Sequence, residues 1–281
     1  MTVQTNSQKK FKKIYLIIAA MIGSIFAGFP VFWMLVSSFK PNGEMFLFPP
    51  TIIAKNPTVS AYLSIFKSPE KIRYFINSYV VALSVAILTI LVAILASYAL
   101  SRYKFLGKNL LNFVIITLQS IPPITLMIPY FALIVKLKLF NTFQGLILSH
   151  IVFTLPYAII MLTAYFNTLP RELDEAVKID AGGPMTILWR ILVPISIPGI
   201  LSVGIYTFMI SWNEFLFALT LTKTQDMRTV PIGIQLLMGQ HSYEWNEMMA
   251  MSILGTLPIA FLFLFFQKYF LGGLTSGAVK A

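Results

Sequence analysis

The chain has 281 residues, of which 57% are hydrophobic and only 11% are charged, and its mean hydropathy is +0.80. Soluble domains carry about 25% charged residues, so this composition indicates a membrane protein. The net charge of +11 does not indicate nucleic-acid binding, because the basic residues are scattered along the chain rather than gathered together. The absence of cysteine excludes disulfides, thiolate metal sites and cysteine nucleophiles.

The N-terminus combines a basic cluster with a long apolar run. Four lysines precede the run, at positions 9, 10, 12 and 13, and the apolar residues extend from about 14 to 38. The apolar core of a secretory signal has only about 7–15 residues, so this run is too long for one. We therefore expect an uncleaved first transmembrane span with residues 1–13 in the cytoplasm.

Six apolar stretches are long enough to cross a membrane, because a spanning helix needs about 20 mostly apolar residues. They cover residues 14–38, 77–101, 109–135, 143–167, 195–221 and 247–269. The sequence therefore predicts an all-α integral membrane protein with six transmembrane helices, organised as one domain over residues 1–281.

Positive charge sets the predicted orientation, because cytoplasmic loops carry an excess of Lys and Arg. With the N-terminus inside, 12 of the 21 Lys and Arg residues fall on the cytoplasmic side, and the short 102–108 loop contains bases but no acid. We expect residues 1–13, 171–194 and 270–281 inside, and residues 40–76 and 222–246 outside.

Prolines interrupt several of these spans. The Pro122-Pro123 pair, flanked by Gln119, Ser120 and Thr125, predicts a kinked third span. Proline leaves backbone carbonyls that neighbouring helices or water must satisfy. A polar path along this kink and simple kinked packing are both consistent with the sequence.

The stretch 171–194 carries the signals of two short helices. Thr168 is expected to cap the first helix, with Pro170 in its first turn. Acidic residues then lie near the positive end of the helix dipole, and Asp174 and Lys178 have the spacing of a favourable i, i+4 pair. Leu173, Ala176 and Val177 form a narrow apolar stripe.

A glycine-proline turn follows this first helix. Gly182 and Gly183 are expected to end it, because glycine tolerates the left-handed backbone conformation. Pro184 suits the first position of a second helix, and Pro194 marks its junction with the fifth span. Such a rigid element is suited to dock into a cleft on a soluble partner, whereas an ordinary solvated loop would need neither helix nor turn signals.

This stretch resembles the EAA motif of ABC importer permeases. The matching residues are Glu175-Ala176-Val177, Asp180-Ala181-Gly182 and Ile191-Leu192-Val193-Pro194. The sequence departs from the motif at Val177, at Val193 and in the inverted order of Ala181 and Gly182, which leaves the geometry of the turn open.

Further fragments extend the resemblance over nearly the whole chain, to the maltose-type branch that imports carbohydrates. They are Asn77-Ser78, "NTFQGLIL" at 141–148, "WNEF" at 212–215 and "GLTSGAVKA" at 273–281. The single short span before the 40–76 loop is similar to the smaller, MalG-type subunit of the permease pair.

The resemblance implies that the EAA loop forms a cytoplasmic coupling helix between spans 4 and 5, which inserts into a groove on an ATP-binding subunit. The implied coupling residues are Glu172, Glu175, Ala176, Asp180, Ala181, Gly182, Gly183 and Pro194. It also implies that the tail contacts the ATPase through Thr275, Ser276 and Gly277.

The resemblance further implies the partners: two ATP-binding subunits, a homologous larger permease subunit and an external solute-binding protein, in a prokaryotic cell membrane. This chain has no G-x-x-x-x-G-K-[ST] loop, so ATP and magnesium are expected on the partner subunits and no cofactor on this chain.

The fifth predicted span holds the candidates for a transport pathway. Glu214 is an ionisable residue within a span, which makes it a functional candidate by default. Trp212 and Asn213 beside it have side chains that stack on or hydrogen-bond sugars, and Tyr206, Met209 and Asn213 share a helical stripe. We expect Glu214 to pair with a neighbouring helix or with the backbone, and the stripe to serve packing, with a pathway role as the alternative.

The two histidines give no sign of a metal site. His150 lies within the fourth span, where we expect a packing role, and His241 lies in the predicted external segment without other metal-ligand residues nearby.

The sequence supports three classes of function to different degrees. The leading one is a non-enzymatic permease subunit that forms half of the translocation pathway of an ATP-driven sugar importer. An intramembrane enzyme would need a catalytic pair in the spans, but Asp174, Asp180 and Asp226 fall in loops and H-E-x-x-H is absent. An ion-coupled secondary transporter is the alternative, although it usually places acids near the midplane and only Glu214 is available.

Overall fold

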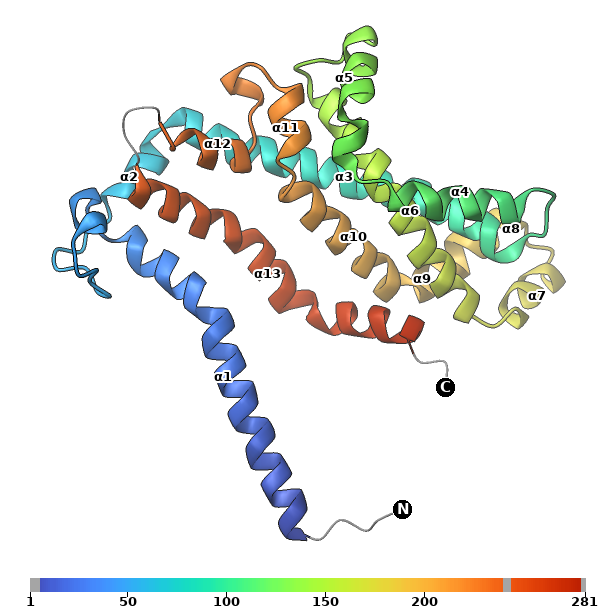
Figure 1. The fold of residues 1–281 in the computed structure, drawn as a ribbon. Coiled ribbons are helices and arrows are strands. Elements are labelled where there is room, and N and C mark those ends of the chain that lie inside the picture. The colour runs from blue at the N-terminus through green and yellow to red at the C-terminus, as the bar shows by residue number, and fades with distance from the viewer. Residues whose placement is uncertain (1–5, 240–243, 279–281) are drawn as a thin grey trace. The chain divides into compact units, whose positions relative to one another are not determined.

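A computed structural model describes the backbone of residues 6–239 and 244–278, and the side chains of residues 12–239 and 244–267. Over these residues the fold is helical and contains no β-strand, which confirms the predicted all-α class. In chain order the helices are α1 (Asn6–Ser38), α2 (Ser60–Lys67), α3 (Pro69–Arg102), α4 (Lys108–Ser120), α5 (Met127–Lys136), α6 (Phe143–Thr168), α7 (Glu172–Ile179), α8 (Pro184–Thr186), α9 (Val193–Ile195), α10 (Ile197–Trp212), α11 (Leu216–Leu221), α12 (Val230–Leu236) and α13 (Trp245–Ala278) (Figure 1).

Shorter helical turns join some of these helices. Three are 3₁₀ turns and one is a π-helical turn; they are Asn42–Phe46, Pro123–Leu126, Gln225–Met227 and, in π geometry, Ile187–Leu192.

The chain divides into two compact units, one of which comprises residues 1–68 and 234–256. In this unit the end of α1 is fastened to α2, because Ser38 Oγ lies 2.7 Å from Tyr62 Oη and the ring of Phe39 packs 5.2 Å from the ring of Tyr62. Asn42 accepts the backbone N–H of Asn246 at 3.1 Å. Most of the apolar face of α1 remains exposed, as expected for a helix that meets lipid or another membrane protein.

The other unit comprises residues 69–233 and 257–281 and is built around α3, α6 and α10. Each of these three helices packs against the other two. Close approach depends on small residues, as is usual between membrane helices: a Cβ on Gly199 of α10 would lie only 2.6 Å from the ring of Tyr165 on α6.

Two clusters of buried apolar side chains stabilise this second unit. One joins α3, α6 and α10 to the π-helical turn, around Phe166, Leu162 and Leu188. The other joins α3, α5, α6 and α11, around Val85, Leu146 and Phe217. The bundle therefore has a buried core along most of the length of α3.

Membrane spans among the described residues number four to six. Four helices are long and apolar enough to cross a bilayer, within α1, α3, α6 and α13. Two further candidates are bent pairs, Lys108–Ser120 with Pro123–Lys136 at 97° and Pro184–Ile195 with Ile197–Trp212 at 77°. The count of six stays a prediction, as do the orientation and the sides assigned to each loop.

Three predicted spans differ in detail from the observed helices. The kink at Pro122-Pro123 is confirmed, and it takes the form of a break of the helix between α4 and α5. The predicted span 195–221 is not a single helix, because α10 stops at Trp212 and α11 begins at Leu216. The second span begins at Pro69 rather than at 77, so the predicted 40–76 loop contains α2 and the first turns of α3.

Candidate functional site

The helix α7 forms the first arm of the 171–194 loop. It begins at Glu172, after Arg171, and carries three acids in its first turn, as predicted. The predicted cap is wrong: Thr168 belongs to the end of α6, where its hydroxyl donates to the carbonyl of Tyr165 at 2.7 Å. The chain needs Leu169 and Pro170 to leave one helix before the next begins, so no residue of α6 is placed to cap α7.

A buried ion pair attaches α7 to the membrane-spanning bundle. Arg102 Nε at the end of α3 lies 2.9 Å from Asp174 Oδ2, with side-chain exposures of 5% and 11%. The guanidinium also donates to the carbonyls of Phe166 and Leu169 at the end of α6. The contact is a charge pair without hydrogen-bond alignment at Nε. The predicted pairing of Asp174 with Lys178 is therefore replaced by a pairing across the fold.

The opposite side of α7 is open. Glu172, Glu175, Ala176 and Asp180 are exposed, while Val177 packs against the core of the bundle. A cavity of about 290 Å³ lies between α7 and the end of α3, with both acids and bases in its wall: Arg102, Arg171, Asp174, Glu175 and Lys178. The helix thus has one anchored face and one face available to a partner.

The turn after α7 differs from the predicted geometry. Ala181, not Gly182, adopts the left-handed conformation, with φ of 55°. The N–H of Gly182 donates to the carbonyl of Val177 at 2.8 Å, and the N–H of Ala181 donates to that of Lys178 at 3.0 Å. These two bonds define a Schellman C-cap.

Gly182 is required for a different reason, which is close approach. A Cβ there would lie 2.4 Å from Val177 Cγ1 and 2.9 Å from the carbonyl oxygen of Val177. Gly183 has open space around its Cα. The inverted Ala-Gly order therefore places an alanine at the strained position and leaves the glycine where a side chain would collide.

The second arm of the loop returns to the bundle. Pro184 is the first residue of α8, as predicted, and the chain then passes through the π-helical turn Ile187–Leu192. Ile187, Leu188 and Leu192 are buried in the core. Pro194 lies in α9, just before the 77° bend that leads into α10, so the predicted junction is confirmed.

Glu214 lies in the break between α10 and α11. Its carboxylate accepts the backbone N–H groups of Phe217 at 2.8 Å and Ala218 at 3.0 Å, so it caps the start of α11. His150 Nε2 on α6 lies 3.2 Å from the same carboxylate, in contact but not aligned as a hydrogen bond, and His150 Nδ1 lies 2.7 Å from Ser211 Oγ. Glu214 is thus engaged by a neighbouring helix and by the backbone, which is the arrangement expected for a structural acid.

The other pathway candidates separate into two groups. Trp212 is 3% exposed and packs edge-on against Tyr79 at 4.8 Å, so its ring is covered by this contact in the structure, and a role in stacking on a sugar stays a prediction. Tyr206 stacks on Tyr157 of α6 at 3.9 Å and is half-buried, as is Met209. Asn213 is exposed, and its amide donates to the carbonyl of Met209. The stripe therefore combines helix packing at Tyr206 with one accessible amide.

Several polar residues matter more than sequence reasoning indicated. The sequence shows Arg102 only as one of the bases in the 102–108 loop, and Asn77, Ser78 and Asn141 only as parts of the fragments that resemble the family. In the structure Asn77 and Ser78 are buried and hydrogen-bonded to distant backbone, and Asn141 bonds residues 223 and 224. One feature of the sequence points to these residues. A polar side chain in an apolar helix is costly in free energy unless it is paired, which implies that each of them has a hydrogen-bond partner.

Two predicted features fall partly outside the described residues. His241 lies outside them, and Thr275, Ser276 and Gly277 are described only as backbone in the last turns of α13. Among the side chains that are described, no group of three His, Asp or Glu residues is placed to hold a metal ion.

The bent, anchored loop and the helical bundle agree with the comparison to known proteins. Residues 86–275 match the family described as binding-protein-dependent transport system inner membrane component. The chain belongs to this family. It is a multi-pass membrane permease subunit of an ABC importer, and the match covers the second half of α3, all of α4 to α12 and most of α13.

Relatives within the family are similar over nearly their whole length. The chain is 37% identical over 276 residues to the trehalose/maltose transport system permease protein MalG of Thermococcus litoralis, covering 97% of this chain and 99% of the relative. It is 35% identical over 263 residues to the sulfoquinovosyl glycerol transport system permease protein SmoH of Agrobacterium fabrum, covering 94% and 92%. These permeases are transport proteins rather than enzymes, in agreement with the predicted class.

Solved structures show the same fold. A chain from the crystal structure of a bacterial ABC transporter involved in the import of the acidic polysaccharide alginate superposes with a TM-score of 0.81 at 17% identity, covering 96% of this chain and all of that chain. A second, from a bacterial alginate ABC transporter in complex with an alginate pentasaccharide-bound periplasmic protein, gives 0.69 at 14% identity, covering 92% and 94%.

Proposed function

We propose that this permease forms half of the translocation pathway for a sugar or oligosaccharide, delivered by an external solute-binding protein and moved at the expense of ATP hydrolysis on partner subunits. The observation that carries the proposal is the two-sided α7, anchored by Arg102 and Asp174 and open at Glu175 and Ala176. An anchored helix with a free polar face transmits force in a way that a solvated loop does not. The carbohydrate substrate rests on the relatives named for trehalose, maltose and sulfoquinovosyl glycerol transport.

The partner ATPase supplies ATP and magnesium in this proposal. The sequence has no phosphate-binding loop of the Walker type, so this chain contributes docking residues and no nucleotide site. Glu172, Glu175, Ala176 and Asp180 are the exposed residues that would meet the ATPase. The tail residues Thr275–Gly277 would add a second contact, and the N-terminus, the tail and the 171–194 loop would then share the cytoplasmic side.

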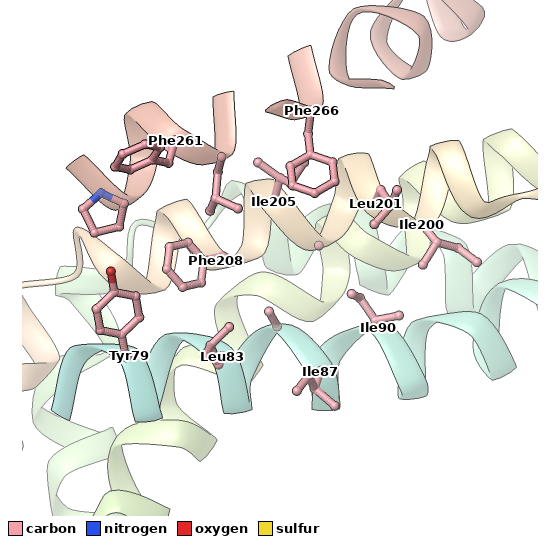
Figure 2. A pocket seen from close by; sticks show the side chains of 14 residues that line it. Tyr79, Leu83, Ile87, Ile90, Ile200, Leu201, Ile205, Phe208, Phe261 and Phe266 are labelled. Carbon is pink, nitrogen blue, oxygen red and sulfur yellow. The ribbon is translucent and has the colours of Figure 1, made fainter. Parts of the chain in front are cut away.

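A second membrane subunit is the other partner we propose. Side chains of α3, α10 and α13 line an apolar groove of about 420 Å³, which Figure 2 shows with Leu83, Ile205 and Phe261 among its walls. The apolar face of α1 is also exposed. A homologous larger permease chain would supply the other half of the pathway, and the exposed Asn213 is then a candidate to meet the substrate.

The test is reconstitution of the permease pair with its ATPase and binding protein in liposomes. With no native cysteine, Ala176→Cys reports one site, and we expect it to crosslink to the ATPase. Gln225→Cys, exposed between α11 and α12, serves as the control that does not crosslink to the ATPase. Glu175→Lys should reduce uptake because it weakens binding of the ATPase. The binding free energy should fall by about 2–5 kcal/mol if the contact is buried.

Two results would count against this function. Uptake that continues without ATP in vesicles holding only an ion gradient would indicate an ion-coupled transporter. Unchanged uptake and ATPase recruitment in Glu175→Lys, with no crosslink from position 176, would show that α7 is not the docking helix.

A further inference from the structure

The segment 222–230, between α11 and α12, is held in place by side chains from other parts of the chain. Apart from Val230, the first residue of α12, its only regular structure is the 3₁₀ turn Gln225–Met227. We refer to residues 222–230 as the clamped segment. A segment with so little secondary structure of its own depends on outside hydrogen bonds for its position.

Two adjacent residues of α3 bind its backbone. Asn77, 3% exposed, donates from Nδ2 to the carbonyls of Asp226 at 2.7 Å and Arg228 at 2.8 Å. Ser78, 2% exposed, accepts the N–H of Val230 at 2.9 Å. Both side chains are buried, and an unpaired polar group is costly in that setting.

Asn141, in the turn between α5 and α6, binds the start of the same segment. Its Oδ1 accepts the N–H groups of Lys223 at 2.8 Å and Thr224 at 3.1 Å. Its own N–H donates to the carbonyl of Leu221 at 2.9 Å. The clamped segment is therefore fixed at both ends, by α3 and by the α5–α6 turn.

The same helix that binds the clamped segment also binds α7. Asn77 and Arg102 lie 25 positions apart on α3, which corresponds to about 37 Å along a helix. Proline stands only at the first position of α3, whereas α1, α6 and α13 each contain one in their interior. Since sharp kinks arise mainly at proline, α3 is suited to move as one stiff rod.

We propose that Asn77 and Ser78 are positioning residues of the transport cycle, which link the clamped segment to α7 through α3. When the ATPase displaces α7, the Arg102–Asp174 pair carries the displacement to α3, and the two side chains at its far end carry it to the clamped segment. The inference rests on the proposed docking of α7 on the ATPase.

The test uses Gln225→Cys as a reporter in the fully reconstituted complex, with labelling by a membrane-impermeant maleimide. We expect the labelling rate to differ between the ATP-free complex and the complex trapped with ATP and vanadate. Asn77→Asp, which keeps the shape but removes both donors, should abolish this difference and raise ATP-free labelling roughly tenfold, because two hydrogen bonds are lost. Ser78→Ala should act in the same direction and is the milder change.

Ser97→Ala is the matched control. Ser97 is also buried on α3, but its hydroxyl donates to the carbonyl of Ile159 on α6 at 3.0 Å and not to the clamped segment. This variant should keep the ATP-dependent difference at position 225. If it loses the difference as well, general packing of α3 explains the result and the proposal is overturned.

Other outcomes are equally decisive. The proposal is overturned if Asn77→Asp and Ser78→Ala both keep the ATP-dependent difference in labelling rate at position 225. If Asn77→Asp does not fold, the labelling of Ser78→Ala alone decides. No difference at position 225 in the parent complex, with normal uptake and crosslinking at position 176, overturns this inference but leaves the proposed function intact. Failure of crosslinking at position 176 overturns both.

Discussion

Arg102 of α3 and Asp174 of α7 form an ion pair of 2.9 Å that joins a membrane helix to the helix expected to meet the ATPase. Both side chains are nearly buried, and the arginine also satisfies carbonyls at the end of α6. Removal of one charge from such a pair leaves the other charge buried and unbalanced, which is much more costly than loss of a surface pair.

Asp174→Asn should therefore destabilise the loop by about 3 kcal/mol. We expect a lower midpoint of thermal unfolding in detergent and less ATPase recovered with the purified permease. Glu172→Gln, a change at an exposed acid on the same helix, should leave the midpoint of thermal unfolding close to that of the parent protein. Equal behaviour of the two variants would show that the buried pair does not hold α7.

The turn after α7 gives a second prediction, with its own control. Ala181→Gly should stabilise the protein by about 1 kcal/mol, because glycine relieves the left-handed strain. Gly182→Ala should destabilise it by about 1–3 kcal/mol, since the new Cβ meets Val177. Gly183→Ala has open space and should change stability least. The order of the three midpoints is the measurement, and a more stable Gly182→Ala variant would refute the close-approach explanation.

Glu214→Gln should fold and keep at least partial transport. The glutamine amide retains one oxygen for the N–H groups of Phe217 and Ala218 but loses the charge beside His150. Asn213→Ala is the informative contrast, because Asn213 is exposed and bonds only within its own turn. Sugar uptake and ATPase activity should be measured together. Complete loss of uptake in Glu214→Gln, with normal assembly and ATPase activity, would make this acid a pathway residue.

Topology can be read from single cysteines, because the chain has none of its own. Ser242→Cys, outside the described residues, should react with an impermeant reagent from the external side. Ala176→Cys should react only from the cytoplasmic side. Labelling of position 242 only from inside would reverse the predicted orientation, which was based on the excess of Lys and Arg in short loops.

The helical class and the presence of membrane spans follow from the sequence alone, because long apolar runs and a low charge content act locally. The form of the 171–194 loop was also predictable in outline. Acids at a helix start, Pro184 at the first position of α8 and a glycine at the turn are short-range signals, and the structure has all three. The exact place of the left-handed residue was not, because the local preference for glycine favours Gly182, whereas the structure has Ala181 there and keeps Gly182 where a side chain would meet Val177.

Long-range partners were decided only by the tertiary structure. Arg102 meets Asp174 across 72 positions, and Asn77 meets Asp226 across 149. Trp212 has the kind of aromatic side chain that can stack on a sugar, yet the fold buries it against Tyr79. Local patterns fix which face of a helix is apolar, but the partner of each buried polar group depends on which helices pack together, and that is settled by the shape and volume of the whole bundle.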